Sequence, residues 1–151
     1  MNMQGKVVII TGSSSGIGAA TAQMCAEAGA AVVVNYSRNL AGAEATVAAC
    51  EAVGGRAIAV QADVAQDATC RKLAEAAISH FDRIDYLVNN AGTTKFAPME
   101  DLDALNADDF ARIFRVNVTG AYQMTRACVP YMRKQGAGAI VNVSSNSAFL
   151  G

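Results

Sequence analysis

The sequence predicts an α/β fold built on a parallel, doubly wound sheet. Five short apolar runs recur along the chain, helical patterns separate them, and the runs are continuous rather than alternating. Continuous apolar runs are typical of strands that are buried on both faces. Regular alternation of strand and helix indicates βαβ units with parallel strands. The expected strands are Val7–Ile10, Ala31–Val34, Ala57–Val60, Tyr86–Val88 and Ala139–Val143.

The first helix is expected to begin soon after the first strand and to end at Gly29. Apolar residues recur in it at helical spacing, so one face is predicted to pack against the sheet. The residues expected on that face are Ile17, Ala20, Met24 and Ala28.

Two further helices follow the second and third strands. The second is predicted from about Leu40 to Val53, because Gly54 and Gly55 come directly after it. The third is predicted to be amphipathic, with an apolar face that points to the sheet. That face consists of Cys70, Leu73, Ala77 and Phe81.

The last helix is the longest and is predicted from about Ala107 to Lys134. Asn106 is a natural N-cap, and Asp109 completes a capping-box arrangement. Its apolar stripe is predicted to include Phe110, Phe114, Asn117, Ala121, Met124, Cys128 and Tyr131. Asn117 is therefore expected to face the core, where an unpaired amide costs about 1–3 kcal/mol. It needs either a structural hydrogen bond to a neighbouring strand or loop, or a functional purpose.

Composition favours one globular domain that covers residues 1–151. The hydrophobic fraction is 52% and the charged fraction 17%, which suits a buried sheet. A net charge of -1 gives no electrostatic reason to expect nucleic acid or a membrane surface as partner. No apolar run approaches membrane-spanning length, and we expect a cytoplasmic protein. No metal site is predicted, because the four cysteines are far apart: Cys25, Cys50, Cys70 and Cys128.

A glycine-rich loop joins the first strand to the first helix, from Thr11 to Gly18. Glycines let backbone N–H groups approach a pyrophosphate, and the positive end of a helix dipole favours negative charge. The spacing is G-x-x-x-G-x-G. Although such clusters are often plain turns, the position in the first βα unit favours nucleotide binding.

The second strand is followed by the segment from Asn35 to Arg38, which contains no acidic residue. A site selective for NAD usually places a carboxylate here to hold the ribose 2′-hydroxyl. Ser37 and Arg38 instead offer donors to a 2′-phosphate, which predicts NADP(H) in preference to NAD(H). The alternative is that Arg38 is simply a solvated loop residue.

Polar or small residues also follow the later strands. Asp63 and Val64 come after the third, Asn90 to Gly92 after the fourth, and Ser144 and Ser145 after the fifth. Open α/β sheets bind ligands at the carboxyl ends of their strands, so all these residues are expected at one edge. The alternative for Asp63 is a turn or cap, and for the serines a hydrogen bond within their own turn.

These motifs, in this order, resemble the classical short-chain dehydrogenase/reductase family and are similar to its 3-oxoacyl-carrier-protein reductases. The resemblance covers essentially all of this chain but only the first part of a family member. It implies a Rossmann-type sheet, truncated after the fifth strand. The positions that match cofactor-binding segments of the family are Gly12, Ser13, Ser14, Ser15, Gly16, Ile17, Gly18, Tyr36, Ser37, Arg38, Asp63, Val64, Asn90, Ala91 and Gly92.

The resemblance also implies a reaction, namely hydride transfer between NADP(H) and a carbonyl or secondary alcohol. It assigns the catalytic serine to Ser145, with Ser144 and Ser147 as competing choices, and a proton-relay role to Asn117. The tyrosine and lysine of the family are expected roughly a dozen residues or more beyond Ser145, past Gly151. The chain by itself is therefore predicted to be inactive.

Two alternatives to a single-chain enzyme remain. One is a non-catalytic dinucleotide-binding module, and the other is one half of a two-chain enzyme. The first of these would leave Ala139–Val143 as a bare apolar edge strand. For the full-length form we expect a homodimer or homotetramer.

Overall fold

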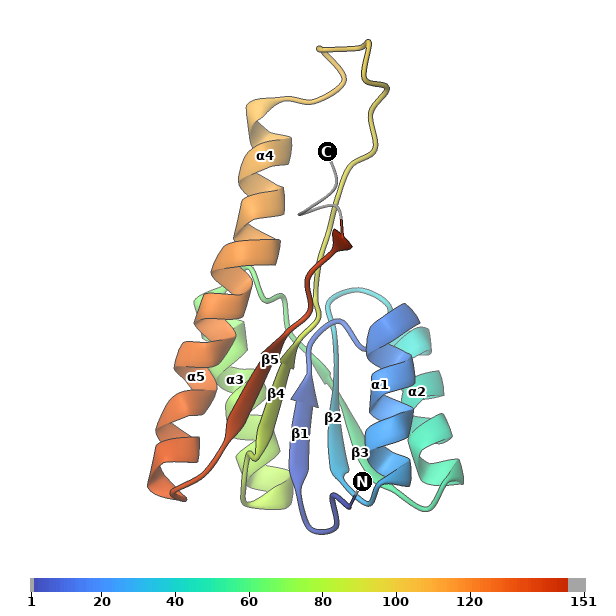
Figure 1. The fold of residues 1–151 in the computed structure, drawn as a ribbon, viewed down its shortest axis with the longest axis vertical. Helices are drawn as coiled ribbons and strands as arrows, with labels where there is room; N and C mark the ends of the chain where they lie inside the picture. Colours follow the sequence, from blue (N-terminus) through green and yellow to red (C-terminus); the bar gives the residue numbers. More distant parts are fainter. Residues whose placement is uncertain (1, 147–151) are drawn as a thin grey trace.

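The computed structural model describes residues 2–146, which form a parallel sheet with helices on both faces (Figure 1). The strand order is β3-β2-β1-β4-β5, and every neighbouring pair is parallel. This confirms the predicted doubly wound α/β fold. The strands are β1 (Val7–Ile10), β2 (Ala31–Tyr36), β3 (Arg56–Gln61), β4 (Tyr86–Asn89) and β5 (Ala139–Asn142).

Helices pack in two layers, one on each face of the sheet. One layer contains α1 (Gly16–Glu27) and α2 (Leu40–Ala52). The opposite layer contains α3 (Asp67–Phe81) and the lower part of a long helix, which consists of α4, η1 and α5. The last three are α4 (Ala107–Phe114), η1 (Arg115–Thr119) and α5 (Gly120–Lys134). None of the helices within residues 2–146 is both long and apolar enough to cross a membrane.

Successive residues of the central strands point to opposite layers. Ile9 packs with α3 and α5, whereas Val8 and Ile10 pack with α1 and α2. All four residues of β1 are buried, as the continuous apolar pattern predicts. The prediction of two buried faces fails for β3 and β5, because each lies at an edge and has exposed positions.

The predicted packing face of α1 is wrong. Ile17 and Met24 are 67% and 69% exposed, and the buried positions are Gly18, Ala22 and Ala26. These small residues let α1 approach the sheet and α2 closely, and the larger side chains point outward. By contrast, the predicted face of α3 is confirmed, since Cys70, Leu73 and Ala77 are fully buried and Phe81 packs against the same core.

The long helix has the predicted extent but changes pitch in the middle. Its five residues from Arg115 to Thr119 form a π-helical segment, a feature often found at functional sites. Below this segment Met124 and Cys128 are buried against the sheet, as expected. Above it Phe110 and Phe114 are exposed, because α4 rises beyond the carboxyl edge of the sheet (Figure 1).

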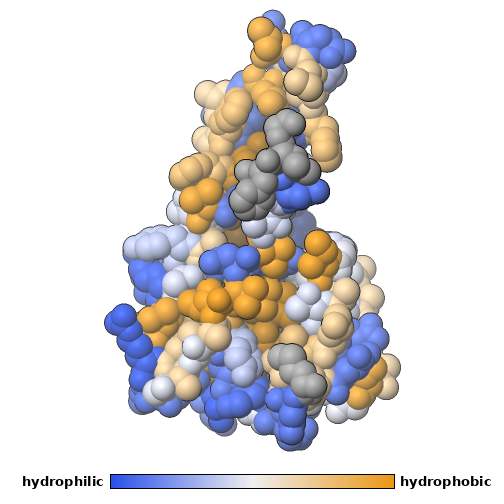
Figure 2. Space-filling model, in the orientation of Figure 1, coloured by the Kyte–Doolittle hydropathy of each residue, from blue (hydrophilic) through white to orange (hydrophobic). Residues whose placement is uncertain are grey.

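Residues 93–114 form this raised arm, which comprises the loop after β4 and helix α4. Hydrophobic side chains continue from the body of the molecule onto the arm (Figure 2). The strongly exposed apolar residues of the arm are Phe96, Met99, Leu102, Phe110 and Phe114. The predicted core-facing position of Asn117 is also wrong, since this residue is exposed at the foot of the arm.

The four cysteines are free thiols and serve as small core residues. Burial raises the pKa of the Cys50 and Cys70 thiols to about 11 and that of Cys128 to about 12. Cys25 is partly buried, and burial raises its pKa as well. These thiols therefore stay protonated at neutral pH, which suits packing rather than nucleophilic chemistry.

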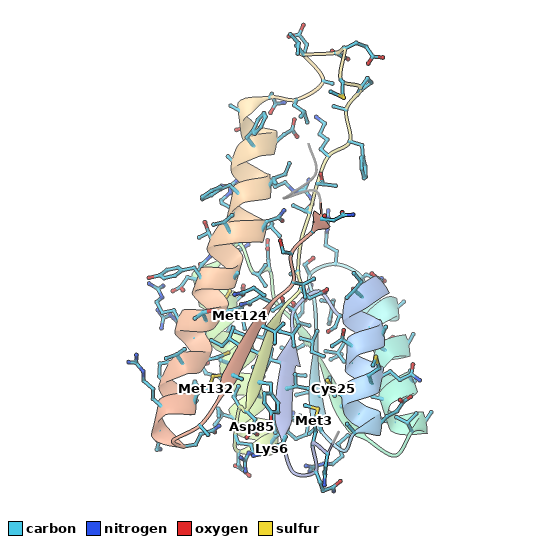
Figure 3. The ribbon with its side chains drawn as sticks, viewed as in Figure 1. Met3, Lys6, Cys25, Asp85, Met124 and Met132 are labelled. Atoms are coloured by element: carbon cyan, nitrogen blue, oxygen red, sulfur yellow. The ribbon has the colours of Figure 1, made fainter. Side chains whose placement is uncertain are left out.

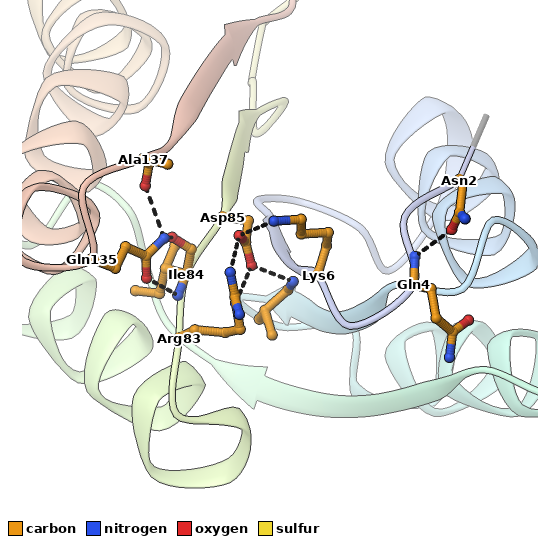
Figure 4. Close-up of polar contacts among 9 residues, drawn as sticks. Asn2, Gln4, Lys6, Arg83, Ile84, Asp85, Gln135 and Ala137 are labelled. Atoms are coloured by element: carbon orange, nitrogen blue, oxygen red, sulfur yellow. Dashed lines mark hydrogen bonds and ion pairs between the residues drawn. The ribbon is translucent and has the colours of Figure 1, made fainter.

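One buried carboxylate organises the amino end of the sheet (Figures 3 and 4). Asp85 accepts hydrogen bonds from the Val7 amide at 2.9 Å, from Lys6 Nζ at 3.2 Å and from Arg83 Nε and Nη2 at 2.7 Å each. Nearby, Gln135 at the end of α5 donates to the carbonyl of Ile84 at 2.6 Å. These contacts fix the segments that lead into β1 and β4, at the end of the sheet opposite the candidate site.

Candidate functional site

A cleft of about 530 Å³ opens at the carboxyl edge of the sheet. Four strand ends, two positions on the raised arm and one on η1 contribute to its walls. This is the edge at which open α/β sheets bind ligands. The lining residues are Gly12, Ser14, Ser15, Asn35, Ser37, Arg38, Ala62, Asp63, Val64, Asn90, Ala91, Gly92, Thr93, Arg112 and Val116.

The glycine-rich loop is fixed from below by Ser13 and Asn35. Ser13 Oγ donates to the Ile10 carbonyl at 2.7 Å and accepts from the Asn35 amide at 3.0 Å. Asn35 Oδ1 accepts from the Gly12 amide at 3.0 Å. Ser13 is fully buried and does not line the cleft, so its side chain shapes the loop from inside.

Thr11 and Asn90 tie this loop to the end of β4. Thr11 Oγ1 accepts from the amides of Asn90 at 3.0 Å and Ala91 at 2.9 Å. The Asn90 side chain donates to the carbonyls of Thr11 at 2.9 Å and Gly12 at 3.2 Å. The sequence-predicted segment Asn90 to Gly92 therefore braces the loop while its backbone lines the cleft.

Two glycines at the start of α1 differ in the space around them. A Cβ on Gly18 would lie 2.7 Å from the Gly12 carbonyl oxygen and 2.8 Å from Ser13 Cα, so this position needs glycine. Gly16 has φ +56° and nothing within 4 Å of an added Cβ. Open space therefore adjoins the first turn of α1.

The start of α1 has the properties of an anion site. Its N-cap residue Ser15 makes no capping side-chain hydrogen bond, and its first turn holds no acidic residue. Unsatisfied N–H groups and the helix dipole favour a phosphate at such a terminus. Ser14 and Ser15 line the cleft beside it, so these residues fit the diphosphate of a dinucleotide.

Most, but not all, of the predicted residues near the ends of β2 and β3 line the cleft. Ser37, Arg38, Asp63 and Val64 line it, whereas Tyr36 packs against the core between the sheet and the α1–α2 layer. Asp63 is the single carboxylate among the lining residues, and its Oδ1 accepts from the Ala65 amide at 3.0 Å. Arg38 makes none of the ion pairs found within residues 2–146.

A second cleft of about 750 Å³ continues toward β5 and shares a wall with the first. Asn117, Tyr122, Ser144 and Ser145 line it, and so does Ile17 from α1. The structure thus brings the two predicted catalytic residues, Asn117 and Ser145, to one cavity. The competing Ser147 lies outside the described residues.

The Asn117 amide pairs with the backbone of the loop after β4. Its Oδ1 accepts from the Thr93 amide at 2.8 Å, and its Nδ2 donates to the Thr93 carbonyl at 3.0 Å. One of the two alternatives for Asn117, a hydrogen bond to a neighbouring loop, is thus present in the structure. This pairing fastens the π-helical segment to the loop after β4, where Thr93 lines the first cleft and Asn117 lines the second.

Thr93 and Arg112 line the cleft but lie outside every sequence motif. Thr11 and Asn35 lie within predicted segments, but the sequence assigned no part in the site to their side chains. Asn35 could have been noticed, since it is a polar residue that continues an apolar strand. Arg112 gives no local signal, because it reaches the cleft from the arm, 20 residues after Gly92.

Comparison with known proteins assigns the chain to a family. Residues 6–151 match the model of the short chain dehydrogenases. An uncharacterized oxidoreductase of Methylorubrum extorquens is 48% identical over 95% of this chain and 56% of its own length. A 3-oxoacyl-acyl-carrier-protein reductase of Synechocystis is 40% identical over 97% of this chain and 58% of its own.

Solved structures agree. A 7α-hydroxysteroid dehydrogenase in complex with NADH and 7-oxo glycochenodeoxycholic acid superposes with a TM-score of 0.91 and 34% identity. The match covers 99% of this chain and 57% of that one. The chain thus spans just over half the length of the curated relatives it matches. It belongs to the short-chain dehydrogenase family.

Proposed function

We propose that this protein is an oxidoreductase that binds NADP(H) and transfers hydride to or from a carbonyl or secondary alcohol. The proposal rests on the first cleft, whose charged and hydrogen-bonding groups suit a dinucleotide. An uncapped helix start favours a diphosphate, and Arg38 stands at the end of β2 where no carboxylate does. The nicotinamide, when bound, would donate the hydride to a carbonyl or accept it from an alcohol.

Most of the predicted cofactor-binding positions fit this proposal. The backbone from Gly12 to Gly18 would hold the diphosphate, with Ser14 and Ser15 at its surface. Asp63 and Val64 offer a carboxylate acceptor beside an apolar wall, which suits an adenine amino group and ring. Asn90, Ala91 and Gly92 lie where the cofactor passes from the first cleft to the second.

The preference for NADP(H) rests on charge. A carboxylate at the end of β2 would repel a 2′-phosphate, whereas the Arg38 guanidinium and the Ser37 hydroxyl can donate to it. Both residues line the cleft, and Arg38 has no carboxylate partner within residues 2–146.

The second cleft is the proposed place of reaction. Ser145 would donate a hydrogen bond to the substrate oxygen, and Asn117 would hold the proton path that the family uses. Tyr122 is the one tyrosine among the residues that line this cleft, and no lysine lines it. We further propose a cytoplasmic homodimer or homotetramer, which would cover apolar side chains such as Phe110 and Phe114.

Arg38→Ala tests the proposal. Binding of NADPH and NADH to the intact protein is measured by isothermal titration calorimetry. We expect NADPH affinity to fall about tenfold or more, because a charge-assisted contact to phosphate is lost. NADH affinity should change less than about twofold, and Arg38→Lys should be intermediate. Equal losses for both nucleotides would contradict the 2′-phosphate role, and no binding by the wild type would contradict the cofactor.

A further inference from the structure

A second arginine faces the nucleotide cleft from the raised arm. Arg112 lies on α4, one helical turn before Val116, and both residues line the cleft. Its Nη2 lies 3.5 Å from Thr93 Oγ1, so the side chain reaches down toward the loop after β4. Neither the glycine-rich loop nor the strand ends supply this group.

The charge of Arg112 has no fixed partner in the described part of the chain. It makes none of the ion pairs found there. Asp109, the nearest acidic residue along α4, is already engaged by Lys95 at 2.7 Å and by the Asn106 amide at 3.1 Å. The guanidinium is therefore free to contact a ligand in the cleft.

The surroundings of Arg112 suit a base better than a phosphate. Arg112 shares the cleft with the apolar residues Val64, Ala91 and Val116 and with Asp63, whose carboxylate would repel an anion. The phosphate-binding features, the start of α1 and Arg38, belong to other elements of the wall. A flat ring with an exocyclic amine, such as adenine, matches this combination.

The position of Arg112 is also restrained. Asn117, five residues later on the same continuous helix, pairs through both amide atoms with Thr93. Lys95 and Asp109 join the loop of the arm to α4 a second time. These contacts hold the foot of α4 over the cleft, so the arginine approaches from a fixed direction.

We propose that Arg112 stacks its planar guanidinium on the adenine ring and closes that end of the cleft. The proposal rests on the dinucleotide function proposed above and adds an affinity-determining residue to it. Stacking by arginine is favourable because its guanidinium is planar, delocalised and weakly hydrated. Lysine, with a compact and strongly hydrated charge, is a poor substitute.

The test measures binding of NADPH, NADH and ADP-ribose to the intact protein by isothermal titration calorimetry. Arg112→Ala should weaken all three by a similar factor of about tenfold, because each contains adenine. Arg112→Lys should lose nearly as much, since it keeps the charge but not the plane. Arg115→Ala is the matched control, because Arg115 is an exposed arginine of the same helix that lines neither cleft.

Each contrary outcome has its own meaning. Wild-type affinity in Arg112→Ala, with binding intact, overturns the role of Arg112 alone. Full affinity in Arg112→Lys overturns stacking in favour of a point charge. A loss confined to NADPH overturns it in favour of a second 2′-phosphate ligand. Failure of the wild type to bind any of the three probes overturns the dinucleotide proposal and this inference together.

Discussion

Asp85 is nearly completely buried, yet it is ionised and surrounded by donors. Burial favours the neutral acid, but hydrogen bonds from Arg83, the Val7 amide and Lys6 outweigh it and hold the pKa of Asp85 below its ordinary value. The two cations are partly exposed, so their charges are screened. The carboxylate thus links the chain before β1 to the start of β4.

Asp85→Asn should lower the free energy of unfolding by about 2 kcal/mol at pH 7, because the charge-assisted bonds are lost within a buried site. Chemical denaturation measures this change. A folded-state pKa below the unfolded value means that the stabilisation is complete above about pH 4. It is lost as the pH falls through the lowered value. The gap between wild type and variant should therefore narrow below about pH 4.

Asp82→Asn is the control for that measurement. Asp82 is exposed, three residues away, and has φ 64°, a backbone conformation that asparagine tolerates well. It should leave stability nearly unchanged. A gap between wild type and Asp85→Asn that stays constant down to pH 2 would contradict the role of the ionised carboxylate.

At the scale of elements, two glycines at the start of α1 have different functions. Gly18 is needed for packing, because an added Cβ would meet the backbone of Gly12 and Ser13. Gly16 has a positive φ and faces open space at the helix start. Gly18 thus supports the fold, and Gly16 leaves room for a ligand.

Gly18→Ala should therefore cost about 3 kcal/mol of stability through overpacking. Gly16→Ala should cost about 1 kcal/mol through backbone strain, yet lower NADPH affinity at least about tenfold by filling the space beside the anion site. Thermal unfolding and calorimetric titration of both variants measure the two effects. The reverse order of destabilisation would contradict this division of roles.

The positions of the strands were predictable from the apolar runs, including the two edge strands that are partly exposed. The five apolar runs identify all five strands of the described sheet to within two residues at each end. Hydrophobic periodicity did not identify the packing face of α1. The buried residues Gly18, Ala22 and Ala26 pack because they are small, not because they are bulky and apolar. Hydrophobic periodicity also did not predict the π-helical segment, within which Asn117 pairs with Thr93.

The candidate site was predictable where residues follow strand ends, since topology alone gathers them at one edge. Ser37, Arg38, Asp63 and Val64 illustrate this. Ser13 and Tyr36 belong to the same motifs, but their side chains turn into the core, a choice that local sequence does not encode. Whether Arg112 reaches the cleft depends on where the arm lies relative to the sheet, and this is a property of the assembled fold.

At the scale of the whole molecule, the two clefts differ in the charged groups that line them. The first is lined by two arginines, by the carboxylate of Asp63 and by several hydroxyl groups. The second contains Ser144, Ser145 and Tyr122, but no lysine is among its lining residues. Binding and proton transfer should therefore separate when residues 1–151 are studied on their own.

We expect residues 1–151 alone to bind NADPH but to show no oxidation of it with a panel of ketones and aldehydes. Calorimetry measures the binding, and absorbance at the nicotinamide band measures the turnover. The physical reason is that Tyr122 has no lysine beside it in the cleft to favour the phenolate or hold the ribose. Turnover that disappears in Tyr122→Phe would contradict the prediction and make Tyr122 the proton donor. Turnover that survives this substitution would contradict it too, and would place the donor elsewhere in the chain.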